Sequence, residues 1–228
     1  MTTRPDLAAF VFDAYGTLFD VHSVVALAES LAPGQGTLLS RIWRTKQLEY
    51  SWLQSLMATP AQPREDFAAI TAHALDYAIA ALALPLDAGA RRRLQDAYLH
   101  LSPYPDAAPA LRALAPRPRV ILSNGTRAML APLVAASGFA AELDDVLSVD
   151  DAGIYKPSPA VYRLATTRMA LAPERIGFVS SNGWDAAGAK AFGYTTFWIN
   201  RDGLPVERHA PAPDFVVASL ALVPGIVG

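Results

Sequence analysis

Short runs of apolar residues, each about as long as a β-strand, recur along the chain between segments with helical spacing. The runs lie at residues 8–12, 120–122, 176–179, 195–199 and 215–217. They are continuously apolar, as in Ala-Ala-Phe-Val-Phe, and such runs are typical of strands covered on both faces. Strands that alternate with helices predict parallel βαβ units. We therefore expect an α/β fold built around a parallel sheet.

A helical pattern occupies the gap of more than 100 residues between the first two apolar runs. One crossover connection needs far fewer residues. The spacing of a long amphipathic helix is followed by Leu39, Ile42, Trp43, Tyr50, Leu53 and Met57, with Lys46 as a polar interruption. Residues 64–83, 88–101 and 106–115 also have helical character, and prolines separate several of these segments. We expect residues 20–102 to form a helical domain inserted into a core of residues 1–19 and 103–228.

Composition and charge narrow the range of functions. Of the 228 residues, 52% are hydrophobic and the net charge is −2, so a sizeable core is expected and a nucleic-acid partner is not. The chain contains no cysteine, which excludes disulfides, thiolate metal sites and cysteine nucleophiles. No apolar stretch is long enough to span a membrane or to resemble a signal peptide. We therefore expect a cytoplasmic protein without a membrane partner.

Polar residues that can carry chemistry follow the predicted strands. Because ligands bind in the crevice at the carboxyl ends of open α/β sheets, we expect these residues to line one crevice. They are Asp13, Ser123, Asn124, Ser180, Asn182 and Asp185, with Lys156 in a loop between two of the strands. Asp13 is the first catalytic candidate, although a lone aspartate at such a position also serves to cap a loop.

Other common chemistries find no support in the sequence. His22, His73, His100 and His209 have no ligand spacing, and no Gly-x-Ser-x-Gly motif is present. No strand leads into a Gly-x-Gly-x-x-Gly turn. A zinc enzyme, a serine hydrolase and a dinucleotide cofactor are therefore not indicated.

The order of strand-end Asp, strand-end Ser, loop Lys and final acidic motif resembles the haloacid dehalogenase superfamily. Three segments are similar to its L-2-haloacid dehalogenases: Phe-Asp-Ala-Tyr-Gly-Thr-Leu-Phe-Asp at 12–20, Trp-Arg-Thr-Lys-Gln-Leu-Glu-Tyr at 43–50 and Val-Ser-Ser-Asn-Gly-Trp-Asp at 179–185. The resemblance covers nearly the whole chain. It implies a Rossmann-like core with a helical cap. It also implies that the enzyme hydrolyses L-2-haloalkanoates to D-2-hydroxy acids and releases a halide ion. No metal or organic cofactor is expected, and the resemblance suggests a homodimer.

Two positions separate this chain from the phosphatases of the same superfamily. Those enzymes carry a second Asp two positions after the nucleophile and an acidic residue four positions before the last motif Asp. Here these positions hold Tyr15 and Ser181, so a general acid and a hard oxygen ligand for Mg²⁺ are both missing. A Mg²⁺-dependent phosphatase remains the alternative enzyme. A non-catalytic binding protein of this fold is the other alternative, although Asp13, Lys156 and Asp185 are all retained.

The resemblance implies roles in forming a covalent intermediate. Asp13 displaces the halide from C2 and forms an ester with the substrate, while Arg44 and Asn124 stabilise the departing halide. Ser123 and backbone amides near Tyr15 hold the substrate carboxylate. Since a carboxylate that attacks an anionic substrate meets a like charge, cations are needed, and Lys156 and Arg44 supply them.

The resemblance implies further roles in hydrolysing that ester. Asp185, with Asn182 and Lys156 nearby, activates the water. The residues expected to orient the reacting groups by hydrogen bonds are Thr17, Ser180 and Tyr162, and those expected to form apolar walls are Tyr15, Leu48 and Trp184. One departure concerns residues 58–63, Ala-Thr-Pro-Ala-Gln-Pro, where the family usually brings aromatic residues to the pocket. Either the cap edge is wider here or Phe67 takes that place, which leaves open the chain length and the halogen accepted.

Overall fold

In the computed structural model, which describes residues 6–208 and 211–227, six parallel strands form one sheet. Their order across the sheet is β3-β2-β1-β4-β5-β6, and every neighbouring pair is parallel. The strands are β1 (Ala9–Phe12), β2 (Arg119–Ser123), β3 (Asp145–Ser148), β4 (Ile176–Ser180), β5 (Thr195–Ile199) and β6 (Phe215–Val217). The predicted α/β class with a parallel sheet is thereby confirmed.

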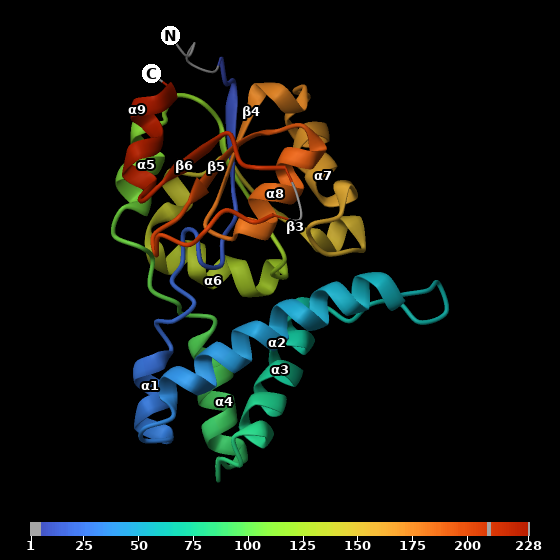
Figure 1. Cartoon of the computed structure of the whole chain (residues 1–228), viewed down its shortest axis with the longest axis vertical. Coiled ribbons are helices and arrows are strands. Elements are labelled where there is room, and N and C mark those ends of the chain that lie inside the picture. Colours follow the sequence, from blue (N-terminus) through green and yellow to red (C-terminus); the bar gives the residue numbers. More distant parts are fainter. Residues whose placement is uncertain (1–5, 209–210, 228) are drawn as a thin grey trace.

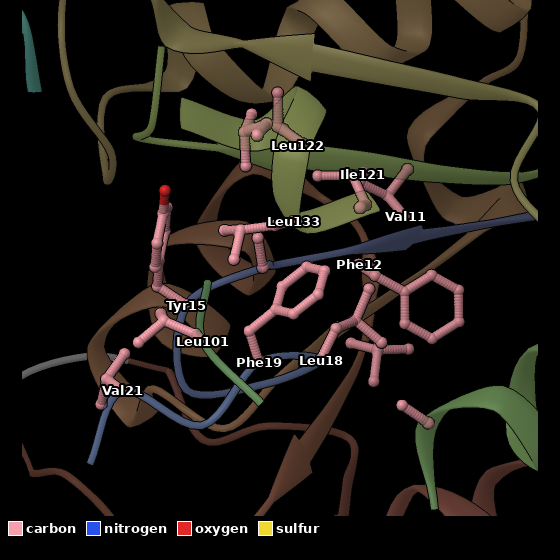
Figure 2. Close-up of a cluster of buried hydrophobic side chains, with 14 of the residues drawn as sticks. Val11, Phe12, Tyr15, Leu18, Phe19, Val21, Leu101, Ile121, Leu122 and Leu133 are labelled. Carbon is pink, nitrogen blue, oxygen red and sulfur yellow. The ribbon is translucent and has the colours of Figure 1, made fainter. Parts of the chain in front are cut away.

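The core lies around β1, whose four residues are all buried. This strand pairs with β2 on one side and β4 on the other, so neither of its edges meets water. Figure 2 shows side chains of β1, among them Val11 and Phe12, beside Ile121 of β2. Residues directly after β1, including Leu18 and Phe19, belong to the same buried cluster. The apolar run of β1 therefore anchors the loop that follows it.

Helices of the core flank this sheet (Figure 1). They are α5 (Ala107–Ala113), α6 (Arg127–Ser137), α7 (Pro159–Met169), α8 (Gly183–Phe192) and α9 (Val223–Val227). The short 3-10 turns η1 (Phe139–Ala141), η2 (Val149–Ala152), η3 (Pro173–Arg175) and η4 (Leu220–Leu222) join some of these elements. Helix α7 packs against α8, and α5 packs against α9. Among the described residues, no helix combines the length and the apolar character needed to cross a membrane.

A second group of helices lies beyond one end of the sheet (Figure 1). It consists of α1 (Val25–Leu31), α2 (Gly36–Met57), α3 (Phe67–Ala81) and α4 (Ala88–Ala97), and α2 packs against both α1 and α3. Two segments of chain connect these helices to the core side by side: the Asp20 amide donates to the Ser102 carbonyl at 2.8 Å, and Phe19 pairs with Pro103. This arrangement is the inserted helical cap that the resemblance implied.

The apolar stripe predicted for α2 is wrong in its C-terminal half. Leu39 and Trp43 are buried as expected, but the buried face continues through Gln47 and Ser51. Leu53 and Met57 are 41% and 65% exposed. Gln47 tolerates burial because its amide is hydrogen-bonded, donating to Thr71 Oγ1 at 2.7 Å.

Three other predicted helices were too long, and one strand was not predicted. The helix expected at 64–83 begins at Phe67, because the Asp66 side chain caps it by accepting from the Ala69 amide at 2.8 Å. The helix expected at 88–101 ends at Ala97, and the one expected at 106–115 spans α5 alone. Strand β3 at the sheet edge was not predicted.

Candidate active site

The candidate residues meet where the strand order of the sheet reverses. The chain proceeds from β1 to β2 and β3 on one side, and then returns to β4 on the other side of β1. Such a switch point leaves a crevice at the carboxyl ends of the two central strands. Asp13 directly follows β1, Ser180 ends β4, and Asn182 precedes the first turn of α8. The topology therefore brings segments about 170 residues apart to one place.

Asp13 is a buried carboxylate, 5% exposed, that accepts three hydrogen bonds. Its Oδ2 accepts from Thr17 Oγ1 at 3.0 Å and from Asn182 Nδ2 at 2.8 Å. Its Oδ1 accepts from Lys156 Nζ at 3.1 Å. These donors come from the loop after β1, from the residue that precedes α8 and from the loop before α7. They fix the orientation of the carboxylate and satisfy its negative charge.

Lys156 bridges Asp13 and Asp185. Its side chain is 1% exposed, and its Nζ donates to Asp185 Oδ2 at 2.8 Å as well as to Asp13. Burial alone would lower the pKa of Lys156, but the two carboxylates outweigh it and raise that pKa above its ordinary value. The Lys156 backbone amide also donates to Asn124 Oδ1 at 3.1 Å. Lys156 is therefore a charged lysine held at both its backbone and its side chain.

Asp185 on α8 is fully buried behind this lysine. Its Oδ1 accepts from the Tyr162 hydroxyl at 2.8 Å, and its Oδ2 accepts from Ser180 Oγ at 3.2 Å in addition to Lys156. Burial raises the pKa of Asp185 to about 6; Lys156 opposes the rise and the charge on Asp13 adds to it. The pKa of the Asp185 carboxyl is therefore shifted toward neutrality by its burial.

Arg44 reaches the site from α2 in the cap. Its Nη2 donates to the Tyr15 carbonyl and to Asn182 Oδ1, each at 3.4 Å, and its Nη1 donates to Gln47 Oε1 at 2.8 Å. The fully buried Gln47 in turn accepts from the Tyr98 hydroxyl at 3.2 Å. Gln47 thus fixes the direction in which the guanidinium points, a role that was not predicted. Its signals in the sequence were its place in the 43–50 segment and its position three residues after Arg44, on the same face of a helix.

Asp13 and Arg44 line a small cavity of about 10 Å³. That volume is on the scale of a single water molecule. The lining residues are Asp13, Tyr15, Arg44, Leu48, Phe67, Asn124, Asn182 and Trp184. Phe67 supplies an aromatic wall, with its ring centre 5.8 Å from that of Tyr15, whereas residues 58–63 do not line the cavity. The Tyr15 hydroxyl is buried and has no hydrogen-bond partner among the described residues.

The other predicted residues lie behind the cavity rather than in its wall. Ser123 is fully buried, and its Oγ accepts from the Gly125 amide at 3.1 Å. Thr17, Ser180 and Tyr162 hold the two carboxylates, as described above. Among the described residues, no group of three or more His, Cys, Asp or Glu side chains is placed to hold a metal ion. His209 and residues 1–5 and 228 lie outside the described part of the chain.

Comparisons with known proteins agree with this geometry. The family model of the haloacid dehalogenase-like hydrolases matches residues 7–193. An (S)-2-haloacid dehalogenase from Pseudomonas putida is 44% identical over 95% of this chain and 94% of its own length. A haloacetate dehalogenase from Moraxella is 45% identical over 92% of this chain and 93% of its own length.

A solved structure extends the likeness to three dimensions. The L-2-haloacid dehalogenase from Xanthobacter autotrophicus with chloropropionic acid covalently bound is 40% identical, with a TM-score of 0.89 over 97% of this chain and 98% of that one. The similarity seen in the sequence motifs is thereby confirmed. The chain belongs to the haloacid dehalogenase-like hydrolases and, within them, to the group of the (S)-2-haloacid dehalogenases.

Proposed function

We propose that this enzyme hydrolyses L-2-haloalkanoates to D-2-hydroxy acids with inversion at C2, through an ester on Asp13. The observation that carries the proposal is the Asp13 carboxylate, buried and held by Lys156, Asn182 and Thr17 at a small cavity that Arg44 also lines. The names of the relatives support the substrate class. The covalently bound chloropropionic acid of the Xanthobacter structure supports the intermediate.

In the first step, a carboxylate oxygen of Asp13 attacks C2 of the substrate. The C–O bond forms as the carbon–halogen bond breaks, and the halide leaves with the bonding electron pair. Arg44 and Asn124 stabilise the departing halide, because fixed donors act strongly on developing charge in a closed site. The positive charges of Arg44 and Lys156 offset the negative charges of Asp13 and Asp185, so the site accepts an anionic substrate. Backbone amides near Tyr15 hold the substrate carboxylate, whereas Ser123, predicted to share this role, is buried behind the cavity and accepts from the Gly125 amide.

In the second step, water attacks the carbonyl carbon of the Asp13 ester. Asp185, together with Asn182 and Lys156, activates this water, which adds its oxygen to Asp13 as the acyl C–O bond breaks. The hydroxyl oxygen of the product therefore comes from Asp13, and C2 is inverted only once. Thr17 orients Asp13, while Ser180 and Tyr162 orient Asp185 through the hydrogen bonds already described.

This reaction needs neither a metal ion nor an organic cofactor in our proposal. The Lys156 ammonium, 3.1 Å from Asp13 and 2.8 Å from Asp185, offsets the negative charges of both carboxylates without a metal ion. Tyr15 and Ser181 stand where the phosphatases of the superfamily carry acidic residues. The phosphatase alternative is therefore not favoured. The non-catalytic alternative is not favoured either, since the relatives are named as enzymes.

A single turnover in water labelled with heavy oxygen tests the ester. With enzyme in excess over L-2-chloropropionate, the lactate formed should contain no label, and the peptide containing Asp13 should gain one labelled oxygen. Mass spectrometry of both measures the outcome. Label in the lactate during the first turnover would instead mean that water attacks C2 directly, and would contradict the proposal.

The raised pKa of Asp185 predicts how turnover depends on pH. Burial is the largest cause of the raised pKa of Asp185, and a protonated Asp185 cannot activate water. Because the Asp13 ester carries no charge to add to this rise, we expect kcat to be level above neutrality and to fall about tenfold per pH unit below the pKa that Asp185 has in the ester, with the ester accumulating. Steady-state kinetics together with acid-quench mass spectrometry measure both effects. A constant kcat down to about pH 4.5, near the ordinary pKa of a carboxyl, would exclude Asp185 from the hydrolysis step.

We also propose the division into domains and a homodimer. The paired connecting segments at Phe19 and Pro103 support a cap of residues 20–102 on a core of residues 1–19 and 103–228.

Leu38 and Tyr77, each 44% exposed on neighbouring cap helices, offer an apolar surface for a second copy. A cytoplasmic location is part of the same proposal, supported by the absence of cysteine. Sedimentation velocity tests the dimer.

A further inference from the structure

We propose that an apolar groove beside the reaction cavity binds the alkyl chain of long 2-haloalkanoates. This inference rests on the proposed function and names the substrates that this site takes. The groove lies between the C-terminal half of α2, the loop before α7 and the start of α8. Its volume is about 610 Å³, and its walls include Trp52, Leu56, Ile154, Tyr155, Pro157 and Trp184. That volume is in the range of small-molecule sites.

The groove and the reaction cavity share Trp184 as a wall. The polar groups of the cavity are Asp13, Arg44, Asn124 and Asn182, whereas its apolar groups include Leu48 and Trp184. The carboxylate and the halide of the substrate occupy the polar side. The substituent on C2 consequently points toward the apolar side, of which Trp184 is the member that faces the groove.

The reaction cavity has room for a water-sized group, about 10 Å³, so any 2-haloalkanoate has to widen it on binding. A chain that extends from C2 then passes Trp184, the lining residue that the cavity shares with the groove. The ring of Trp52 meets Trp184 edge-on, with ring centres 5.4 Å apart. The Trp52 indole nitrogen is buried without a hydrogen-bond partner among the described residues. No hydrogen bond to the indole is therefore lost when the Trp52 ring turns aside for a chain.

The charges around the groove favour a neutral chain. Lys156 contributes to its lining, but the Lys156 ammonium is paired with Asp13 and Asp185. The other ionisable side chain of the lining, apart from the tyrosine, is Glu207, an exposed carboxylate. A second carboxylate on the ligand would therefore find no lysine or arginine of the lining free to pair with it. An alkyl chain instead meets apolar walls, among them Leu56, which is 83% exposed.

Turnover of a homologous series of L-2-bromo acids, from propionate to decanoate, tests the groove. We expect kcat/KM to rise about twofold for each added CH₂ up to the octanoate, below the roughly fourfold that complete burial of a CH₂ gives. A fall of more than tenfold between the propionate and the hexanoate, with normal turnover of the propionate, would overturn the proposal. Absence of turnover with the propionate itself would count against the proposed function.

Binding of acids without halogen tests the groove independently of turnover. Decanoate should bind at least about tenfold more tightly than propionate, since several CH₂ groups leave water. Isothermal titration calorimetry with the unmodified enzyme measures both. Equal affinities would show that the chain stays in solvent, and would overturn the proposal even if the enzyme is a dehalogenase.

A matched pair of substitutions on α2 tests whether the groove causes the dependence of kcat/KM on chain length. Leu56→Gln removes an apolar wall of the groove, whereas Leu53→Gln changes the same residue type one turn earlier, outside the groove lining. We expect Leu56→Gln to lower kcat/KM for the octanoate about fivefold and to leave the propionate unchanged, with no effect from Leu53→Gln. If Leu56→Gln converts a dimer to monomers and leaves the chain-length profile unchanged, a second copy covers this groove and the proposal is wrong.

Discussion

Replacement of Asp13 by Asn is expected to abolish halide release, with a loss of at least about 10⁴-fold in kcat/KM. The amide has the shape of the carboxylate but is not a nucleophile toward C2. Its nitrogen also meets donors, because Asn182, Thr17 and Lys156 all donate toward this position. Halide release from L-2-bromopropionate measures the loss, and circular dichroism shows whether the variant folds.

Asp20→Asn is the matched control for this substitution. Asp20 lies in the same segment, and its Oδ1 accepts from the His22 amide at 2.8 Å, but it does not line the reaction cavity. We expect it to keep nearly full activity. Mass spectrometry should verify that the asparagine introduced in Asp13→Asn has not reverted to aspartate by deamidation. Asp13→Asn activity within about a hundredfold of the unmodified enzyme would contradict an ester on this residue.

Replacement of Lys156 by Met is expected to impair both activity and folding. The variant leaves Asp13 and Asp185 buried without their shared cation, which costs about 3–5 kcal/mol of stability. Activity should fall at least about 10³-fold, since one of the two carboxylates then takes up a proton. Urea unfolding should show a smaller loss of stability near pH 5 than near pH 8, because protonation relieves the repulsion.

Lys190→Met provides the contrast at a partly exposed position. Lys190 also pairs with an aspartate, Asp214, at 2.6 Å, but both side chains are about one third exposed. Its removal should cost no more than about 1 kcal/mol and should leave turnover unchanged. Equal losses of stability in the two variants would show that burial does not increase the contribution of the Lys156 ion pairs to stability. Unchanged turnover in Lys156→Met would remove this lysine from the mechanism.

The central strands could be predicted because burial on both faces requires continuous apolar runs. The run at β1 is uninterrupted and lies in the middle of the sheet. Strand β3 escaped prediction because it lies at the sheet edge and is only four residues long, beginning with Asp145. Half-buried edge strands carry polar residues, so their pattern does not differ from that of a loop.

The candidate site likewise contains residues that the sequence could predict and residues that it could not. Residues at strand ends, such as Asp13 and Ser180, could be predicted because parallel topology places all strand ends at one edge. Gln47 could not, since its partners Thr71 and Tyr98 lie 24 and 51 residues away on other segments of the cap. The predicted apolar stripe of α2 did not include Gln47, and only the packing of the cap shows that it is buried. The role of Phe67 as an aromatic wall likewise depends on how α3 packs.

Chloride release from the separate enantiomers of 2-chloropropionate, in excess EDTA, tests the central claim most directly. A parallel assay follows p-nitrophenyl phosphate with added Mg²⁺. Chloride released from the L enantiomer alone, at a rate that EDTA does not change, is the expected result and establishes both the metal-independent reaction and its stereochemistry. No chloride from either enantiomer, together with magnesium-dependent phosphate release, would contradict the account and identify a phosphatase instead.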